Sequence, residues 1–235
     1  MSLYLDIDLD YFVSPHLRES VANHRPQANP GMRQVDPTVL FNILREKEIQ
    51  LGDQRFIFTN HMQSHLRWWL ARKPDNRVIH IDAHSDLYGH TQPNLSRLNM
   101  LGCQNYLWHS IREGLVSEIY WVFPDDIVNI QDPNIVYTMF SPEQIARVSA
   151  EDNILHVDLA CILPDGTRKT VAYHILKTEA LPVFKETAEI ITVASSPEFY
   201  PPQFDSLIQQ VGEILAFPTD VLDRIRTQHT EMKEL

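Results

Sequence analysis

Apolar residues recur along the chain with two different spacings. Short runs of apolar and β-branched residues predict six strands, at Leu3–Leu9, Arg55–Thr59, Val78–Asp82, Ile119–Phe123, Ile154–Leu159 and Ile190–Ala194. Segments with helical spacing lie between them, at 38–49, 60–72, 95–113, a short piece from Ser141, 204–215 and 221–226. Several strand segments are apolar at consecutive positions, as in a sheet that helices cover on both faces. This alternation predicts an α/β fold, with residues 1–235 forming one domain.

The stretch from Ser14 to Gln34 interrupts this pattern. It contains three prolines and Gly31 and shows no periodicity. We expect a long loop there, which is either a lid or binding loop over a site or a plain surface excursion.

The composition narrows the classes of function. The chain carries 20 basic and 31 acidic residues, a net charge of −11, which argues against a nucleic-acid partner but not against a metal ion or a cationic substrate. Its seven glycines are too scattered for a glycine-rich phosphate loop. Cys103 and Cys161 are isolated, and the chain has neither a signal-peptide pattern nor an apolar run long enough for a membrane helix. We therefore expect a reduced, soluble, cytoplasmic protein, with a homo-oligomer left open.

The first group of candidate site residues follows the predicted strand at 78–82. Asp82, His84 and Asp86 stand at a spacing of two, directly after an apolar strand. In extended backbone alternate residues point to the same side, so these three side chains can converge just beyond the strand end. Two carboxylates and one imidazole suit manganese, zinc or iron(II).

The first predicted strand carries a second group of acids. Asp6, Asp8 and Asp10 alternate with leucine and isoleucine. Three like charges on one strand face are costly unless a cation neutralises them. A divalent metal does so directly, and a wet edge strand is the alternative. Whether Asp10 joins the site stays open at this point.

Two further residues stand where strands meet helices. His61 follows the predicted strand at 55–59 and is a candidate metal ligand, whereas His65, one helical turn later, is more typical of a structural histidine. Glu198 lies in a proline-rich turn after the strand at 190–194, where it either recognises a cationic substrate group or begins the next helix.

Weaker signals lie elsewhere along the chain. His156 and Asp158 are mid-strand and favour a structural role, and whether Asp158 joins the site stays open. Asp125 and Asp126 follow the strand at 119–123 and favour a plain turn. His90 and His174 are candidate proton shuttles.

These motifs resemble the arginase/deacetylase superfamily. Asp82-Ala83-His84-Ser85-Asp86 matches the DAHxD metal motif of the arginase/agmatinase group, and Asp6-Ile7-Asp8 resembles that superfamily's DxD motif, although here it precedes DAHxD in the chain. His61 and Glu198 are similar in placement to a further histidine ligand and to the family's substrate-side glutamate. The combination is closest to an uncharacterised branch that carries DIDLDYF and HIDAHSDL motifs.

The resemblance implies a three-layer α/β/α sandwich around a mainly parallel sheet, with its chain order permuted. It further implies two manganese, zinc or iron ions at the carboxyl edge of the sheet. In this pattern Asp6 and Asp82 bridge the two metals, and the terminal ligands are His84, Asp86, Asp8 and His61.

The leading functional hypothesis is a metal-dependent hydrolase that cleaves a guanidino, ureido or amide C–N bond with a metal-activated water. Asp86, His84 and Glu198 are the candidate catalytic residues, and Asp86 or Asp8 accepts the proton. The expected substrate is a small molecule, and a positively charged one would suit this site. A magnesium-dependent phosphatase is an alternative, with Asp6 as nucleophile, Asp8 as acid/base and Asp125 and Asp126 on the metal. A metal-binding homologue without catalysis is the third.

Overall fold

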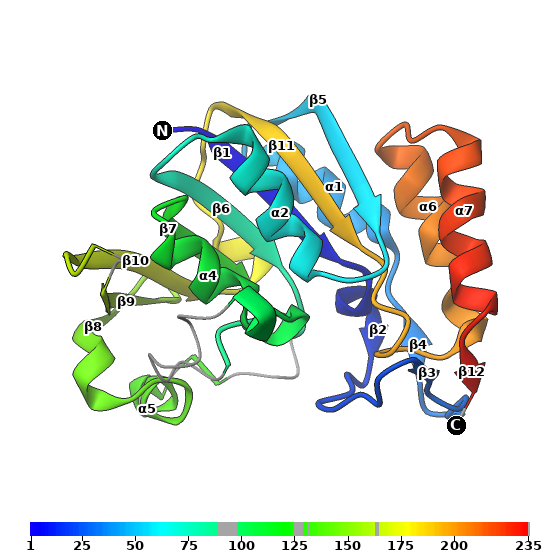
Figure 1. The fold of residues 1–235 in the computed structure, drawn as a ribbon, viewed down its shortest axis with the longest axis horizontal. Coiled ribbons are helices and arrows are strands. Elements are labelled where there is room, and N and C mark those ends of the chain that lie inside the picture. Colours follow the sequence, from blue (N-terminus) through cyan, green and yellow to red (C-terminus); the bar gives the residue numbers. More distant parts are fainter. Residues whose placement is uncertain (89–97, 125–128, 131, 163–164, 235) are drawn as a thin grey trace.

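The computed structural model describes residues 1–88, 98–124, 129–130, 132–162 and 165–234. Its centre is an eight-stranded sheet with the order β5-β11-β1-β6-β7-β10-β9-β8 (Figure 1). The strands are β1 (Leu3–Asp8), β5 (Ile49–Phe58), β6 (Asn76–Ile81), β7 (Val116–Val122), β8 (Ile145–Glu151), β9 (Ile154–Ile162), β10 (Arg168–Leu176) and β11 (Glu186–Ala194). Neighbours from β5 to β10 run parallel, and β9 and β8 continue the sheet antiparallel at one edge. The predicted α/β class with a mainly parallel sheet is therefore confirmed.

Helices cover both faces of this sheet. One apolar core packs α1 (Pro37–Glu46), α6 (Ser206–Ile214) and α7 (Thr219–Thr230) against β1, and a second packs α2 (Met62–Ala71) and α4 (Tyr106–Arg112) against the opposite face (Figure 1). A further short helix, α5 (Val136–Met139), lies near β8. β1 is buried at every residue, and it lies between β11 and β6 in the interior of the sheet. This arrangement is compatible with a three-layer sandwich.

Local signals explain where the first helices begin and end. Asp36 caps α1 by accepting a hydrogen bond from the Thr38 amide, and Pro37 occupies the first helical position. Arg72 ends α2 in a left-handed conformation. None of the helices in the described part of the chain combines the length and the apolar character that crossing a membrane requires.

Two of the predicted helices are wrong in extent or type. Among the described residues of the segment expected at 95–113, which are 98–113, only α4 is α-helical, and Leu98–Met100 and Cys103–Asn105 are 3₁₀ turns. The Asn105 side chain accepts the Gly102 amide at 2.9 Å in place of a helical bond. The segment from Ser141 forms a single 3₁₀ turn, 142–144, that leads into β8. The sequence reasoning also missed β10, although its buried Val171, Tyr173 and Ile175 alternate with more polar positions.

Short strands anchor the irregular stretch at 14–34. Strand β2 (Val13–Ser14) pairs with β4 (Arg33–Gln34), and β3 (His24–Arg25) pairs with β12 (Lys233–Glu234) near the end of the chain (Figure 1). The stretch is thus pinned at three points rather than being a free loop.

Candidate metal centre

The polar residues that the sequence singled out meet at the carboxyl ends of β1, β6 and β11. Asp8 is the last residue of β1, and Asp82 directly follows β6, its parallel neighbour. His61 stands just before α2, after β5. Open parallel sheets place their sites at this edge. We use "the candidate centre" for the six residues Asp8, Asp10, His61, Asp82, His84 and Asp86.

One half of the candidate centre is arranged around the His61 ring. Its Nδ1 atom lies 3.1 Å from Oδ2 of Asp8, 3.0 Å from Oδ2 of Asp82 and 3.1 Å from Oδ2 of Asp86. Ligand atoms at adjacent corners around a cation with bonds of about 2.1 Å lie roughly 3 Å apart. Each of the three oxygens therefore lies at a ligand-to-ligand distance from the His61 nitrogen, and Asp8, His61 and Asp82 together form one ligand set that could hold a divalent cation.

The other half lies on the far side of Asp82. Nδ1 of His84 is 3.0 Å from Oδ2 of Asp10 and 3.5 Å from Oδ1 of Asp82. Asp82 thus turns one oxygen to each half, and it is the residue that the two halves share. Asp10, which the sequence left open, is brought into this group because β1 ends at Asp8 and a 3₁₀ turn, 9–12, redirects the chain.

Hydrogen bonds fix both imidazoles so that Nδ1 faces the carboxylates. His84 donates from Nε2 to the Leu17 carbonyl at 2.8 Å, and His61 donates from Nε2 to Oδ2 of Asp6 at 3.1 Å. Although burial opposes it, the neighbouring carboxylates raise the pKa of both imidazoles, so a metal would displace the Nδ1 proton while Nε2 keeps its own. In characterised metal sites, carbonyls and carboxylates that accept a hydrogen bond from the other ring nitrogen orient ligand histidines in this way.

Asp6 is surrounded by donors. Its Oδ1 accepts from Ser64 at 2.7 Å and from Thr192 at 2.6 Å, and its Oδ2 accepts from Tyr106 and faces His61 at 3.1 Å and His80 at 3.2 Å. The side chain has no exposed surface. Although burial opposes ionisation, His61 and His80 hold the pKa of Asp6 well below its usual range. Asp6 is therefore a carboxylate whose oxygens are already occupied by protein groups.

The carboxylates of the candidate centre are in the opposite situation. Burial, together with Asp10 and Asp82, raises the pKa of Asp8 to about 7, and burial with the charge of Asp82 raises the pKa of Asp86 to about 6. Burial and Asp82 also raise the pKa of Asp10. These shifts measure how unfavourable a group of buried negative charges is when only imidazoles oppose it.

The polar atoms that lack hydrogen bonds show what the cluster fits. Among the described residues, Nδ1 of His61, Oδ2 of Asp82 and both carboxylate oxygens of Asp10 are buried without a hydrogen-bond partner of good geometry. Such atoms are costly unless a ligand engages them. Carboxylate oxygen and imidazole nitrogen are the donors that manganese, zinc and iron(II) accept. The candidate centre therefore fits metal ions. Hydrogen bonds within the protein alone do not account for its buried polar atoms.

A cavity of about 130 Å³ opens beside His61. Its lining includes Cys103, Ser196, Glu198 and Phe199. The Phe199 ring lies 4.6 Å from the His84 ring, and Oε1 of Glu198 accepts the Asn23 amide at 2.5 Å. Burial raises the pKa of the Cys103 thiol to about 12, so that side chain is neutral. The cavity therefore has the Glu198 carboxylate and the Phe199 ring in its wall, at the edge of the candidate centre.

No protein-family model, curated protein or solved structure matches this chain. The interpretation of the site consequently stands on its own geometry.

The other predicted residues lie away from this cluster or outside the described residues. His65 donates to or accepts from Ser110 at 2.9 Å between α2 and α4, and His174 pairs with His156 at 2.9 Å on β10 and β9. Asp158 is on β9, which stands four positions from β1 in the sheet. His90, Asp125 and Asp126 lie outside the described residues.

Several functional neighbours were missed from the sequence. Tyr106, Thr192 and Ser196 all bond to Asp6 or Asp8, yet they lie 100, 186 and 188 residues away in the chain. His80 was overlooked although it stands in the HIDAHSDL motif. Its Nε2 lies 3.1 Å from the His84 carbonyl oxygen, so it braces the turn that carries the DAHxD residues.

Proposed function

We propose that this protein is a metal-dependent hydrolase that cleaves a C–N bond of a guanidino, ureido or amide group. The observation that carries the proposal is the pair of buried ligand sets that share Asp82 and adjoin an open cavity. Their chemistry agrees with the resemblance to arginases and deacetylases.

The ligand assignment follows the distances. Asp8, His61, Asp82 and Asp86 would hold one divalent ion, and Asp10, Asp82 and His84 would hold the second. The four carboxylates together carry four negative charges, which two divalent cations neutralise. We assign Asp6 to the orientation of His61 rather than to a bridge between metals, because five protein groups already contact its oxygens.

The protein's own groups supply the remaining functions. A divalent ion, when bound, polarises the substrate and lowers the pKa of water at the site. Asp86 and Asp8 stand beside the proposed ions, where a carboxylate can accept a proton. Glu198 and the Phe199 ring suit a cationic group, through charge and through the aromatic face.

The phosphatase alternative has less support. An aspartyl nucleophile needs an oxygen open to the substrate, and Asp6 is fully buried with both oxygens accepting hydrogen bonds. The alternative also leaves the convergence of Asp82, His84 and Asp86 unused. We therefore retain the hydrolase, with a metal-binding homologue that lacks catalysis as the outcome if turnover is absent.

The test is the metal content of the purified protein by elemental mass spectrometry, after loading with manganese, zinc or iron(II). We expect about two equivalents in the wild type and loss of both in Asp82→Ala, because Asp82 serves both halves. Asp10→Asn should keep about one equivalent. Asp220→Ala, which changes an exposed helix residue, is the matched control and should keep both. No transition metal in the loaded wild type would overturn the proposal.

Activity is measured next, on the loaded protein. Guanidino, ureido and amide compounds with and without a cationic group form the screen, and Asp82→Ala is the blank. Turnover that disappears in Asp82→Ala supports the hydrolase. Full metal content without turnover across the screen would favour the non-catalytic homologue.

A further inference from the structure

A second group of buried polar residues lies on the other side of the loop that follows β11. Ser195 Oγ is 2.7 Å from Nε2 of His229, and Nδ1 of His229 is 3.0 Å from Oδ1 of Asp205. Arg25 donates to both oxygens of Asp205, at 2.7 and 3.1 Å. We call Arg25, Asp205, His229 and Ser195 the C-terminal network, because two of its members belong to the segment of α6 and α7.

The order serine, histidine, aspartate is that of a hydrolase triad, yet the surroundings exclude a nucleophile. Ser195 has no exposed surface. The cavity beside the candidate centre is lined by Ser196 and not by Ser195. A nucleophilic hydroxyl must reach the substrate carbon and must stand beside donors for the developing oxyanion. Ser195 therefore holds structure and does not attack.

The next residue connects this network to the candidate centre. Ser196 donates to Oδ2 of Asp8 at 2.5 Å, which is the oxygen that faces His61. Ser195 and Ser196 are adjacent, so their side chains anchor one piece of backbone from two sides. Ser196 has a φ of +37°, a conformation that a serine keeps only when its surroundings impose it.

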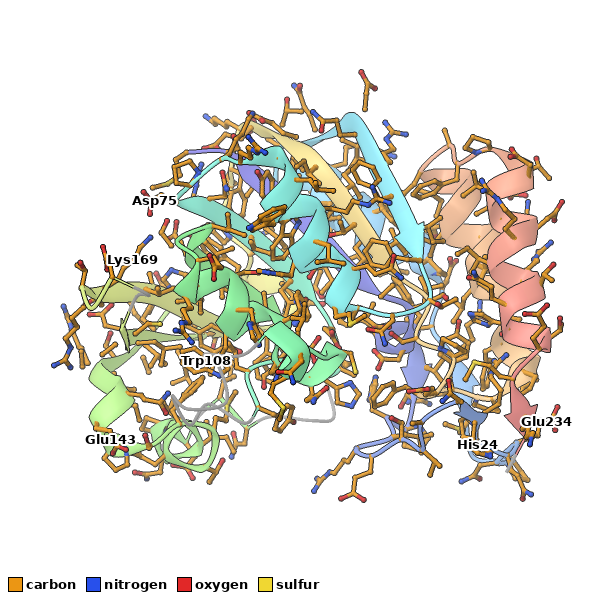
Figure 2. The ribbon with its side chains drawn as sticks, viewed as in Figure 1. His24, Asp75, Trp108, Glu143, Lys169 and Glu234 are labelled. Carbon is orange, nitrogen blue, oxygen red and sulfur yellow. The ribbon has the colours of Figure 1, made fainter. Side chains whose placement is uncertain are left out.

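The same network lies beside the strand pair β3 and β12, whose neighbouring residues reach the cavity. Arg25 belongs to β3, which pairs with β12, and His24 and Glu234 mark these two strands in Figure 2. Asn23, two residues before Arg25, donates its amide to Glu198. Asn23 and Met232 both line the cavity. The network thus contacts the loop that carries Ser196 and Glu198, and it also holds the segments that border this loop at the cavity.

We propose that the C-terminal network positions the loop at 195–199, so that Ser196 orients the ligand Asp8 and Glu198 faces the cavity. Ser195 and His229 are positioning residues in this assignment. The consequence for metal binding rests on the proposed function, whereas the hold on the loop does not.

Two alanine variants make a matched pair. Ser195→Ala removes the hydroxyl that bonds His229, and Ser110→Ala removes an equally buried hydroxyl that bonds His65 at 2.9 Å, between α2 and α4. Ser110→Ala also loses a bond from this hydroxyl to the Tyr106 carbonyl at 3.0 Å, so it removes at least as much hydrogen bonding as Ser195→Ala does. A purely structural role for Ser195 predicts the same Mn²⁺ affinity for both variants.

The first measurement is hydrogen–deuterium exchange by mass spectrometry on protein kept metal-free with EDTA. We expect peptides that cover 194–200 to exchange about fivefold faster in Ser195→Ala, the size of effect that one lost hydrogen bond gives, with no change there in Ser110→Ala. His229→Gln is the second variant and should give the same local effect. If exchange at 194–200 stays at the wild-type rate in both Ser195→Ala and His229→Gln, the proposal is overturned.

The second measurement is the affinity for Mn²⁺ alone, with Ser196→Ala as the reference. We expect Ser195→Ala and Ser196→Ala each to weaken Mn²⁺ binding about fivefold, and the double variant to lose no more than either single one, because both changes act through Asp8. Ser110→Ala should bind as the wild type does. Additive losses, or faster loop exchange without weaker Mn²⁺ binding, would contradict the link to Asp8. A wild type that binds no Mn²⁺ would sink the proposed function, while the exchange experiment would still decide the hold on the loop.

Discussion

The candidate centre and the C-terminal network each combine aspartate with histidine, and Ser196, which bonds Asp8 of the centre, directly follows Ser195 of the network. In the network, each carboxylate oxygen, each ring nitrogen and the serine hydroxyl has a protein partner. In the candidate centre, Nδ1 of His61 is crowded by three carboxylate oxygens, and the Asp10 oxygens have no hydrogen-bond partner within the described part of the chain. Both clusters contain aspartate and histidine, but the network adds Arg25 and Ser195 as partners, and among the described residues only Nε of Arg25 in it is buried without a hydrogen bond.

This difference separates structural from functional use of buried charge. A buried charge is tolerated when a partner and hydrogen bonds compensate it. Asp205, with Arg25 and His229, meets that condition, and its pKa stays low despite burial. The raised pKa values of Asp8 and Asp86 show that the candidate centre does not meet it without a ligand. The predictions below test whether a cation is the missing partner and whether the network is complete without one.

The largest expected effect is stabilisation by metal. Mn²⁺ at about 100 times its dissociation constant should raise the free energy of unfolding by about 2.7 kcal/mol, because it binds only the folded chain. The midpoint of thermal unfolding should then rise by about 5 to 10 °C. Calorimetry of the EDTA-treated protein with and without Mn²⁺ measures this. Asp82→Asn should show no rise, and a wild type equally insensitive to Mn²⁺, Zn²⁺ and Fe²⁺ would erase the contrast between the two clusters.

A buried histidine without any carboxylate gives the next test. Burial, with His109 nearby, lowers the pKa of His65 to about 4 from its ordinary 6.5. Between pH 6.5 and 4 the unfolded chain therefore binds a proton that the folded chain does not, so stability is full above 6.5 and falls as the pH drops to 4. At pH 4.5 the loss should be about 2.5 kcal/mol, slightly less than metal binding provides.

Urea unfolding of the metal-free protein at several pH values between 4.5 and 7 measures the His65 effect. His65→Gln should have a shallower pH dependence than the wild type over this range, and the difference isolates His65 from the acids. Parallel curves for the two proteins would show that His65 accepts its proton without cost. Burial of the His65 ring would then not predict its protonation behaviour.

The sequence was enough for the parts of the fold and site that depend on neighbouring residues. The buried parallel strands β1, β6 and β11 have continuous apolar runs, and the spacing of Asp82, His84 and Asp86 places them together beyond β6. The sequence did not predict strand β8, because β8 is an edge strand with no fully buried residue. Its sequence therefore lacks the apolar run that marks a strand. The helix expected over 95–113 shortened to α4 because Asn105 bonds to the backbone of Gly102.

The roles within the first strand could not be read from spacing alone. Asp6 and Asp8 share a face by alternation, but which of them meets donors depends on residues far away in the chain. Ser64 and Thr192 reach Asp6, and Ser196 reaches Asp8. Likewise, alternation does not tell that β1 stops at Asp8 and turns Asp10 toward His84. Long-range packing decides these assignments.

Breaking the C-terminal network should cost less than metal binding provides. Asp205→Asn leaves the Arg25 guanidinium, whose side chain is 2% exposed, without its charged partner. We expect a loss of about 2 kcal/mol in the free energy of unfolding, since Asp205 itself is 26% exposed and water partly replaces it. Urea unfolding in EDTA measures the loss. Asp220→Asn, at an exposed site, is the control, and equal stability of the two variants would mean that the network is not a paired cluster.

The smallest effect sharpens the distinction between Asp6 and the ligands beside it. Tyr106→Phe removes one hydroxyl donor to Asp6 but leaves Ser64 and Thr192 in place. Because Asp6 keeps most of its donors, the free energy of unfolding should fall by only about 1 kcal/mol. Mn²⁺ affinity should weaken by about fivefold, since Asp6 still orients His61 through Nε2. Titration calorimetry with Mn²⁺ gives the affinity, and two bound equivalents should remain. If the stoichiometry instead dropped to one, Asp6 would be a metal ligand, and its hydrogen bonds in the metal-free protein would only stand in for an ion.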